Sequence, residues 1–410
     1  MTHPACLGCG APLTRTWVDL GVQPLANSNI DPERADAPEA KYPLHARVCD
    51  VCLLVQVDRV VPREAIFNAD YAYFSSYSDS WLDHCQRYAA AMTARFGLGA
   101  HSRVVEVASN DGYMLQYFVA ARVPVLGVEP SGNTAAAAIA KGVPTDIAFF
   151  GRVTAERLAA SGHRADLLAA KNVLAHVPDI NDFAEGVARL LKPEGVFTVE
   201  FPHLLRTIAG VQFDTIYHEH FTYLSLLAVE RVLARAGLRA FDVEELPTHG
   251  GSLRVFACLN DAAHVETPSL ARVRLDETTA GLDAPRGYAG FDARCQAVRD
   301  GLQAFLGDAR GQGKTVAGYG AAAKGNTLLN YCGAGPGTLA FIADRSLAKQ
   351  GKLAPGSHIP ILAPEVIFEG RPDYVLILPW NLRAEVMAQL AGIRAWGGRF
   401  VTAIPAIAVD

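Results

Sequence analysis

Short apolar runs alternate with stretches of helical periodicity along most of the chain after residue 100. The first run, 103–108, has the length of a buried strand, and an amphipathic helical pattern follows it. We predict helices over 113–121, 131–141, 152–161 and 181–191, and strands over 123–129, near 145, over 166–170 and, after a turn at 192–195, over 196–200. Repeated strand and helix units predict a parallel doubly wound sheet that binds its ligands at the carboxyl ends of the strands.

The pattern changes beyond residue 238. Runs 239–245 and 252–257 resemble strands joined across a turn at 247–251, which predicts an antiparallel finish to the sheet. Residues 263–311 are mostly helical, and the strand and helix alternation resumes at Lys314. This favours a second, smaller nucleotide-binding type of fold at the end of the chain.

The length of 410 residues is too great for one ordinary core, so several domains are expected. A helical stretch over 81–96 leads into the first sheet. The predicted fold class is α/β, with a small N-terminal unit over 1–66, a central Rossmann-like domain over 67–262, a helical linker over 263–311 and a C-terminal Rossmann-like domain over 312–410.

Composition limits the class of ligand. Apolar residues make up 50% of the chain, the net charge is -5 and the pI is near 6.2. This balance gives no strong field for nucleic acid or an anionic membrane, so the expected partner is a small molecule. The N-terminus lacks the pattern of a signal peptide, and no apolar run approaches the roughly 20 residues that span a bilayer. We expect a cytoplasmic protein and take it as a monomer, although no feature of the sequence fixes the oligomeric state.

Four of the eight cysteines form two knuckles, Cys6-x-x-Cys9 and Cys49-x-x-Cys52. Two such knuckles supply four thiolates that can close tetrahedrally around one zinc ion. A full shell of four thiolates leaves no position for water or substrate, so the predicted zinc is structural. The other four cysteines lie in apolar or helical settings and are interpreted as ordinary buried thiols.

The stretch 213–223 concentrates side chains that transfer protons, with Tyr217, His218, Glu219 and His220 in succession. Histidine, glutamate and tyrosine can remove a proton, orient the base and hydrogen-bond a developing oxyanion, which are the functions that enolise a carbonyl compound. A polar loop without a chemical role has a similar composition, so these four residues alone leave both explanations open.

A first nucleotide site is predicted where the first two strands of the central sheet end. The turn 106–112 contains Glu106, Asn110, Asp111 and Gly112, and Glu129 ends the second strand, where an acid can accept hydrogen bonds from both hydroxyls of a ribose. The turn lacks the G-x-G-x-x-G that brings backbone against a pyrophosphate. A nucleoside cofactor without phosphates fits better than a dinucleotide, and S-adenosylmethionine is such a cofactor.

Asn172 and His176 follow the fourth strand, where the residues of active sites gather in such sheets. We assign Asn172 to the cofactor and His176 to the chemistry. A histidine before Val-Pro could equally cap its loop, which is the alternative for His176.

A second glycine-rich turn, 318–325, follows a strand in the C-terminal domain, and Asp344 ends the next strand. Gly-x-Gly-x-x-Ala followed by an acid some twenty residues later is also typical of a site for NAD. Lys324 in this turn favours instead the diphosphate of a substrate, with Gly320, Asn326 and Asp344 around it. A turn that only packs its helix on its strand is the structural alternative.

Four further residues are candidates for substrate contact. His249 and Arg254 flank the Gly-Gly turn of the predicted hairpin, where a structural role is equally open, and we assign Arg254 to the substrate. Trp380 and Asn381 follow the strand 374–378 and could meet a nucleotide base.

Together these motifs resemble those of the sugar C-methyltransferases, which add a methyl branch at C3 of a nucleotide-linked 4-keto hexose. The resemblance covers nearly the whole chain. Its motifs are the two cysteine knuckles, 21–27 (GVQPLAN), 71–76 (YAYFSS), 106–112, Tyr217-x-Glu219-His220, 249–254 (HGGSLR) and 318–326.

The resemblance implies a zinc-binding N-terminal domain, a central class I methyltransferase domain for S-adenosylmethionine and a C-terminal domain that helps hold a dTDP-sugar. It also implies that His220 is the base and that Tyr71, His176, Tyr217 and Glu219 lie near the sugar. One departure is His218, since a member of the family has an acid there. Adjacent residues of an extended segment face opposite sides, so we expect His218 to point away.

The expected reaction is methylation at C3 of a dTDP-linked 4-keto-deoxysugar. His220 would remove the C3 proton, Glu219 or a neighbour would fix the tautomer of His220, and donors such as Tyr217, Tyr71 or His176 would stabilise the enolate. The alternatives are an NAD-dependent nucleotide-sugar oxidoreductase, a sugar O-methyltransferase, and a zinc-bearing scaffold that binds nucleotide sugars without turnover.

Overall fold

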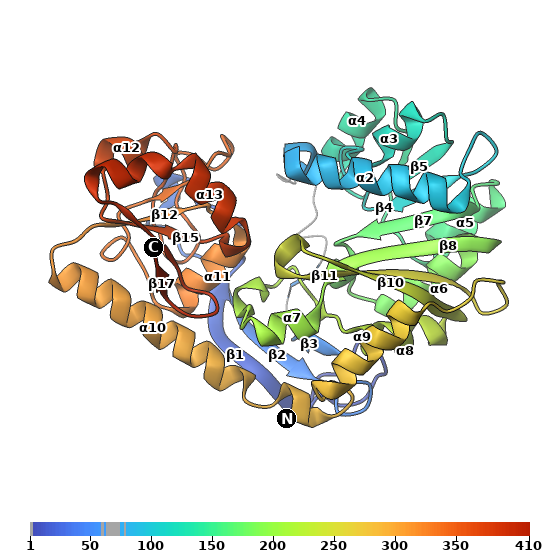
Figure 1. The fold of residues 1–410 in the computed structure, drawn as a ribbon, viewed down its shortest axis with the longest axis horizontal. Coiled ribbons are helices and arrows are strands. Elements are labelled where there is room, and N and C mark those ends of the chain that lie inside the picture. Colours follow the sequence, from blue (N-terminus) through green and yellow to red (C-terminus); the bar gives the residue numbers. More distant parts are fainter. Residues whose placement is uncertain (1–2, 59–60, 63–73, 78) are drawn as a thin grey trace.

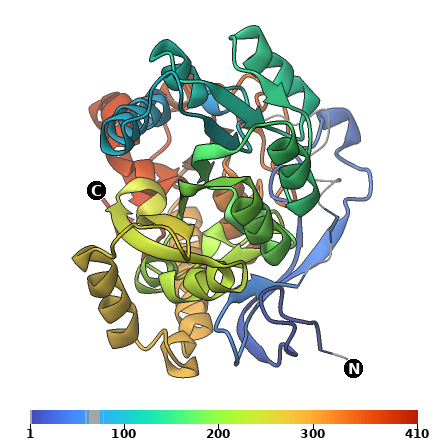
Figure 2. The same ribbon diagram turned by 90° about the vertical axis from the view of Figure 1, so that its right-hand side faces the viewer.

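Three β-sheets organise the part of the chain that this computed structural model describes, which is residues 3–58, 61–62, 74–77 and 79–410. Figure 1 shows the central sheet on the right and the C-terminal sheet on the left, with the N-terminal strands and the long helix α10 (Phe291–Gly311) running beneath them. Figure 2 shows the N-terminal strands lying alongside the central domain. The N-terminal unit therefore connects the two larger domains.

The central sheet has the strand order β10-β11-β8-β7-β4-β5-β6. Its strands are β4 (Val104–Val107), β5 (Val125–Val128), β6 (Thr145–Asp146), β7 (Ala165–Lys171), β8 (Leu191–Pro202), β10 (Leu238–Leu246) and β11 (Ser252–Leu259). β11 runs antiparallel to both β8 and β10, whereas the five strands from β8 to β6 are parallel. The predicted doubly wound sheet with an antiparallel finish is confirmed.

Helices cover both faces of this sheet. The helices are α2 (Asp79–Phe96), α3 (Leu115–Ala120) and α4 (Gly132–Ala140) on one face, and α5 (Arg152–Ala160), α6 (Ile180–Leu190), α8 (Leu226–Arg235) and α9 (Pro268–Thr279) on the other. The strands are buried on both sides, so Val104 packs in one core and Val105 in the other. Side-chain caps fix two helix starts, because Asp179 accepts from the Asp182 N–H and Ser225 from the Ala228 N–H.

The predicted turn at 192–195 lies within β8. The β7–β8 ladder pairs Ala165 with Leu191 and then Leu167 with Val196, so four residues of β8 loop out between the two pairs. A Cβ on Gly195 would lie 2.6 Å from the carbonyl oxygen of Ala165. The glycine therefore lets this loop pass against the neighbouring strand.

The N-terminal sheet has the order β1-β2-β3-β9, from β1 (Arg15–Pro24), β2 (Lys41–Val48), β3 (Val55–Val57) and β9 (Thr222–Tyr223). Its last strand comes from the central domain, two residues beyond His220. On the other side of this sheet, Trp17 of β1 stacks on Phe291 of α10, with ring centroids 4.2 Å apart. The N-terminal sheet thus shares one apolar core with the C-terminal domain.

The C-terminal sheet has the order β14-β13-β12-β15-β16-β17. Its elements are β12 (Val316–Tyr319), α11 (Ala323–Tyr331), β13 (Ile342–Ala343), β14 (Ile361–Leu362), α12 (Val366–Gly370), β15 (Tyr374–Ile377), α13 (Arg383–Gln389), β16 (Arg399–Thr402) and β17 (Ala408–Val409). In this sheet β12 and β15 are the neighbours at which the strand order reverses, as β4 and β7 are in the central sheet. Ligands of such sheets bind at these points.

Short elements complete the chain: α7 (Leu204–Ala209) and the 3-10 turns η1 (Pro32–Arg34), η2 (Ser75–Tyr77), η3 (Leu174–His176), η4 (Phe213–Thr215), η5 (Thr248–Gly250), η6 (Pro285–Tyr288), η7 (Trp380–Leu382) and η8 (Ala391–Trp396). Within the predicted linker, α9 packs on α8 and β10 of the central domain, whereas α10 packs on β1. The domain boundaries themselves stay predictions.

Candidate active site

The two cysteine knuckles meet at one point of the N-terminal unit. The Sγ atoms of Cys6, Cys9, Cys49 and Cys52 all lie within 4.8 Å of one another, with Cys6 and Cys52 3.4 Å apart and Cys9 and Cys49 3.5 Å apart. Four thiolates about 2.3 Å from a tetrahedral zinc ion would be separated by roughly 3.8 Å. The donor set therefore fits zinc, and the absence of a fifth position fits a structural role.

The zinc-binding knuckles rest on two helices of the central domain. Asn181 of α6 donates to the carbonyl oxygens of Leu7 and Gly8 at 3.0 and 3.1 Å, and Arg231 of α8 donates to that of Cys52 at 2.8 Å. The metal site is thus positioned to hold the N-terminal sheet against the central domain, and its four cysteines do not line the large cavity of the molecule.

A cavity of about 820 Å³ lies between all three sheets. Residues 25–29 of the N-terminal unit line it, as do the carboxyl ends of β4, β5 and β7 and the segments 322–324 and 346–352 of the C-terminal domain. This volume is at the upper end of the range for small-molecule pockets. The points where strand order reverses in the two larger sheets therefore open into one space.

The part of the cavity predicted to hold the cofactor, called the cofactor half below, is built from strand ends with unusual backbone. Asn110 and Asn172 line it, and both have left-handed φ angles, 48° and 52°. The carboxylate of Glu129 accepts the N–H groups of Asn110 and Ser131, each at 2.9 Å. Among the described residues the buried Oδ1 of Asn172 has no hydrogen-bond partner. An unpaired acceptor after β7 and an acid after β5, both in the lining of the cavity, fit a nucleoside cofactor.

The other three residues predicted for the cofactor lie behind the cavity wall. Glu106 is fully buried, and burial raises its pKa well above the ordinary value, although the Tyr113 hydroxyl acts in the opposite direction. Asp111 pairs with Lys141 at 2.9 Å. Gly112 has a φ of 77° and lies against Val143. These residues shape the turn that positions Asn110.

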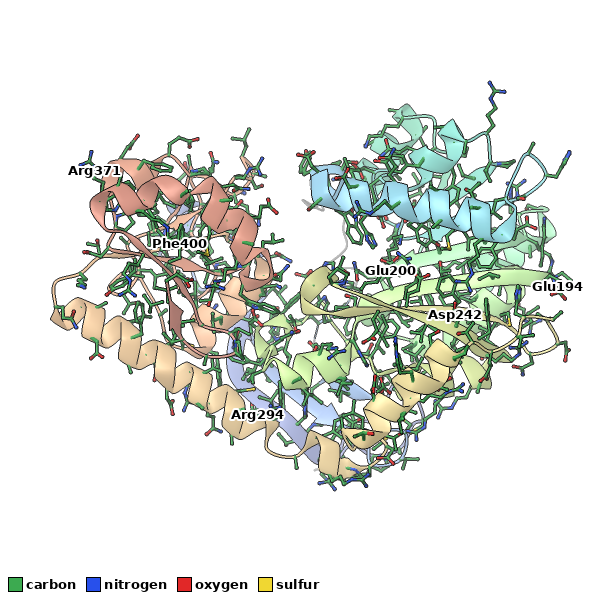
Figure 3. The ribbon with its side chains drawn as sticks, in the orientation of Figure 1. Glu194, Glu200, Asp242, Arg294, Arg371 and Phe400 are labelled. Carbon is green, nitrogen blue, oxygen red and sulfur yellow. The ribbon has the colours of Figure 1, made fainter. Side chains whose placement is uncertain are left out.

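A charged cluster lies beneath the cavity floor. Glu200 at the end of β8 accepts from Lys171, from His84 at 2.8 Å and from Arg254 at 2.7 Å. Burial would raise the pKa of Glu200, but the charge of Lys171, the hydrogen bond with His84 and the charge of Arg254 hold it below its ordinary value. Figure 3 shows Glu200 inside the molecule beneath α2, and Glu194 at the outer edge of the same sheet.

Arg254, predicted to contact the substrate, is part of this cluster. It bonds Glu200 and Glu244 and is not among the described residues that line the cavity. Lys171, which the sequence did not single out, does line it. A single lysine at the end of an apolar strand has no sequence pattern that predicts a place in the cavity lining.

The residues predicted to transfer protons meet in the same cavity. His220 Nδ1 is 2.9 Å from the carbonyl oxygen of Thr215, and the Tyr217 hydroxyl is 2.9 Å from His220 Nε2. A carbonyl only accepts, so His220 carries its proton on Nδ1 and Nε2 is the basic atom, toward which the Tyr217 hydroxyl donates. Burial lowers the pKa of His220 well below its ordinary value. His220 is therefore a neutral base at physiological pH.

His176 has a matching arrangement. Its Nδ1 lies 2.7 Å from the carbonyl oxygen of Glu219, and its ring centroid lies 4.6 Å from that of His220. Burial lowers its pKa to about 4. The cavity thus contains two adjacent neutral imidazoles, each with its tautomer fixed by a backbone carbonyl.

The remaining residues of the motif have separate roles. Glu219 lines the cavity and accepts from the Asn27 side chain at 2.7 Å, so it links the motif to the N-terminal unit, while the carbonyl of Thr215 fixes the tautomer of His220. His218 faces the N-terminal sheet, where Nε2 lies 3.2 Å from the carbonyl oxygen of Pro43, as expected from its position in the chain. Tyr71 lies outside the described residues.

The glycine-rich turn of the C-terminal domain is held by internal contacts. Gly320 has a φ of 86°, and a Cβ there would lie 2.6 Å from Pro379. Asp344 accepts the N–H groups of Ala321 at 2.7 Å and Ser346 at 2.8 Å, and Asn326 donates to the carbonyl of Ala26. Of the predicted substrate residues in this turn, Lys324 lines the cavity, whereas Gly320, Asn326 and Asp344 do not.

Two residues that were not assigned also belong to the site. His249 lines the cavity with a left-handed φ of 56°, and its buried Nδ1 has no partner among the described residues. Burial lowers its pKa to about 4. Asp214 is fully buried and accepts from Trp380 Nε1 at 2.7 Å. Flanking glycines hinted at His249, but only the fold brings Asp214 and Trp380 together.

Comparison with known proteins decides the family. The chain is 37% identical over 400 residues to the C-methyltransferase NovU of Streptomyces niveus, covering 98% of this chain and 95% of that protein. The chain belongs to the C-methyltransferase family. Three family models match it in succession: "Putative zinc binding domain" over 6–67, "Methyltransferase domain" over 81–243 and "C-methyltransferase C-terminal domain" over 247–405.

Two further similarities are more limited. A ubiquinone biosynthesis O-methyltransferase of Rhizobium etli is 31% identical over 101 residues, covering 24% of this chain and 40% of that protein. A solved magnesium protoporphyrin IX methyltransferase from Synechocystis, with bound S-adenosylmethionine, is 15% identical, with a TM-score of 0.36 and coverage of 49% and 99% of the two chains.

The family membership confirms the predicted enzyme class and both predicted ligands. The protein is an S-adenosylmethionine-dependent C-methyltransferase with a structural zinc site. The match to a C-methyltransferase over nearly the whole chain, including the C-terminal domain, leaves the oxidoreductase alternative without support. No helix within the described ranges is long and apolar enough to cross a membrane.

We predict that Cys9→Ser lowers the zinc content and the stability, because it removes one of four ligands whose binding energy is part of the folding energy. Zinc per chain and the midpoint of urea unfolding measure the effect. Cys332→Ala is the control, since this buried thiol lies outside the zinc cluster. Full zinc occupancy with unchanged stability in Cys9→Ser would exclude the structural role.

Glu129→Gln should weaken S-adenosylmethionine binding by about tenfold to a hundredfold, which corresponds to the roughly 1.5–3 kcal/mol of a charged hydrogen bond. The amide would present N–H toward the backbone N–H groups that the carboxylate now accepts. Isothermal titration calorimetry gives the Kd, with Glu156→Gln on the surface of α5 as the control. An unchanged Kd in the folded variant would contradict the assignment of the cofactor half.

Proposed function

We propose that this enzyme methylates C3 of a nucleotide-linked 4-keto-deoxyhexose, with dTDP as the carrier, by removing the C3 proton with His220. The observation that supports this most is the neutral imidazole of His220, which presents a basic Nε2 in the same cavity as the cofactor half. C-methylation requires a carbon nucleophile. A 4-keto group makes the neighbouring C3–H acidic enough for a histidine base.

The base and its neighbour Tyr217 form a pair. The Thr215 carbonyl holds the Nδ1 proton of His220, so the C3 proton must go to Nε2, the atom that the Tyr217 hydroxyl contacts. The proton reaches Nε2 directly once the hydroxyl turns toward the sugar, or it passes through the hydroxyl. Tyr217→Phe separates the two routes, because only the relay is lost in that variant.

When bound, S-adenosylmethionine supplies an electrophilic methyl group for C3. The residues that would hold it are Asn110, Glu129 and Asn172, at the ends of the parallel strands. Attack on a methyl carbon needs near-linear geometry at roughly 3–3.5 Å. Two separate domains facing one cavity can hold cofactor and sugar independently in that geometry.

The nucleotide diphosphate would lie on the C-terminal side of the cavity. Lys349 and Lys352 line this part with side chains 28% and 38% exposed, and two cations at an accessible rim suit a diphosphate. Asn27 and Ser28 of the N-terminal unit also line the cavity, and their segment contacts the C-terminal domain, since Ile30 pairs with Leu353. Trp380, which was expected near the base, donates its N–H to Asp214.

The direct test is to incubate the enzyme with S-adenosylmethionine and a panel of nucleotide-linked 4-keto sugars, and to look for one added methyl group by mass spectrometry. We expect a gain that NMR maps to C3. His220→Asn should abolish it, with cofactor binding intact. His218→Asn is the matched control, because His218 faces the N-terminal sheet. Methylation on oxygen, or activity retained in His220→Asn, would overturn the proposal.

The pH profile gives a second test. A base is active when it is neutral, and burial places the pKa of His220 well below 6.5. The acid limb of kcat/KM for C3 hydrogen–deuterium exchange should therefore lie below pH 6.5, with activity retained as the pH falls through that value. A limb at or above pH 6.5 would contradict a neutral, buried base.

A further inference from the structure

The enolate that the proposed reaction forms needs a hydrogen-bond donor or a cation at its oxygen. Neither His176 nor His220 can donate from Nε2 while neutral, because both direct their Nδ1–H groups to backbone carbonyls. The Tyr217 hydroxyl is directed at His220 Nε2. His176 and His220 therefore present acceptors to the substrate, and another group must stabilise the negative charge of the enolate oxygen.

Lys324 is the cation that lies with these groups. It stands in the first turn of α11 and lines the cavity, and its ammonium lies 2.7 Å from Asn381 Oδ1 and 4.7 Å from the centre of the Trp380 ring. Its charge is close enough to lower the pKa of both His220 and His249, in addition to the effect of their burial. An ammonium has three donors, and Asn381 takes one of them among the described residues.

An acid whose charge acts on Lys324 lies in the segment that also orients His220. Asp214 is fully buried in η4, and burial raises its pKa to about 6 while the charge of Lys324 acts against that rise. The next residue, Thr215, accepts the Nδ1 proton of His220. One turn of the central domain thus orients His220 and carries the acid whose charge acts on Lys324.

We propose that the Lys324 ammonium donates to the C4 oxygen of the substrate and stabilises the enolate. This rests on the proposed function and replaces the expected role of Lys324 in binding the diphosphate. The lysines at the accessible rim, Lys349 and Lys352, are left for the diphosphate, whereas Lys324 lies among the proton-transfer groups.

The chemical step balances within the site. The C3–H bond breaks, its proton moves to Nε2 of His220, and its electron pair forms the C3–C4 double bond. The π electrons of the C4 carbonyl move onto oxygen, where the charge meets the Lys324 ammonium. The field of Lys324 also favours neutral His220 before the reaction, and the enolate offsets that field when His220 becomes charged.

The test measures C3 hydrogen–deuterium exchange by NMR, without S-adenosylmethionine, using the keto sugar that the wild-type enzyme methylates. Lys324→Met should slow exchange at saturating substrate by about 10²- to 10³-fold, the usual effect of removing an oxyanion donor. Its Kd for dTDP, which has the diphosphate but no C4 oxygen, should stay within about threefold, whereas Lys349→Met should raise that Kd by about tenfold or more. Lys324→Arg, which keeps the charge, should recover part of the rate.

The opposite result overturns the proposal: exchange within about threefold of wild type in Lys324→Met, with dTDP binding weakened tenfold or more, would assign Lys324 to the diphosphate. If Lys324→Met does not fold, Lys324→Gln is measured in the same assay and judged by the same rate and Kd. If the wild-type enzyme neither exchanges C3 nor methylates any 4-keto sugar, the proposed function fails and this proposal fails with it.

Discussion

The segment 213–223 is hydrogen-bonded to all three parts of the chain, and the geometry of the site depends on these bonds. Within it, Thr215 orients His220. Toward the C-terminal domain, Asp214 accepts from Trp380 and the Ile216 carbonyl from Thr327. Toward the N-terminal unit, residues 222–223 join the sheet as β9. A shift of either outer domain would therefore move His220.

The electrostatics of the site follow from burial. The imidazoles of His176, His220 and His249 are all held neutral because charging them in the cavity would cost solvation, and the charge of Lys324 adds to that cost for His220 and His249. Such an environment favours a base that gains a positive charge only as an anion forms beside it. The zinc site lies outside this chemistry and holds the N-terminal unit on α6 and α8.

Local patterns predicted much of the architecture. Apolar runs and helical spacing located the strands and helices of the central sheet, and the antiparallel hairpin of β10 and β11 followed from its turn and flanking strands. The spacing of Cys6, Cys9, Cys49 and Cys52 was sufficient to predict a zinc site, because each Cys-x-x-Cys knuckle is a local motif that places two thiolates together. The turn at 192–195 was predicted at the correct position. The sequence pattern placed it before the strand, whereas the pairing of Leu191 with β7 makes it a loop within β8.

By itself the sequence determined the order of domains, the cysteine cluster, the family resemblance and the concentration of proton-transfer residues at 217–220. Only the tertiary structure decided which side chains share the cavity. It brings Lys324 into the same cavity as His220 and His249, and it lets the Thr215 carbonyl fix the tautomer of His220. It also places Arg254, Asn326 and Asp344 outside the cavity lining. The physical reason is that tautomer, charge and pKa depend on neighbours distant in sequence, whereas periodicity and metal-ligand spacing are local.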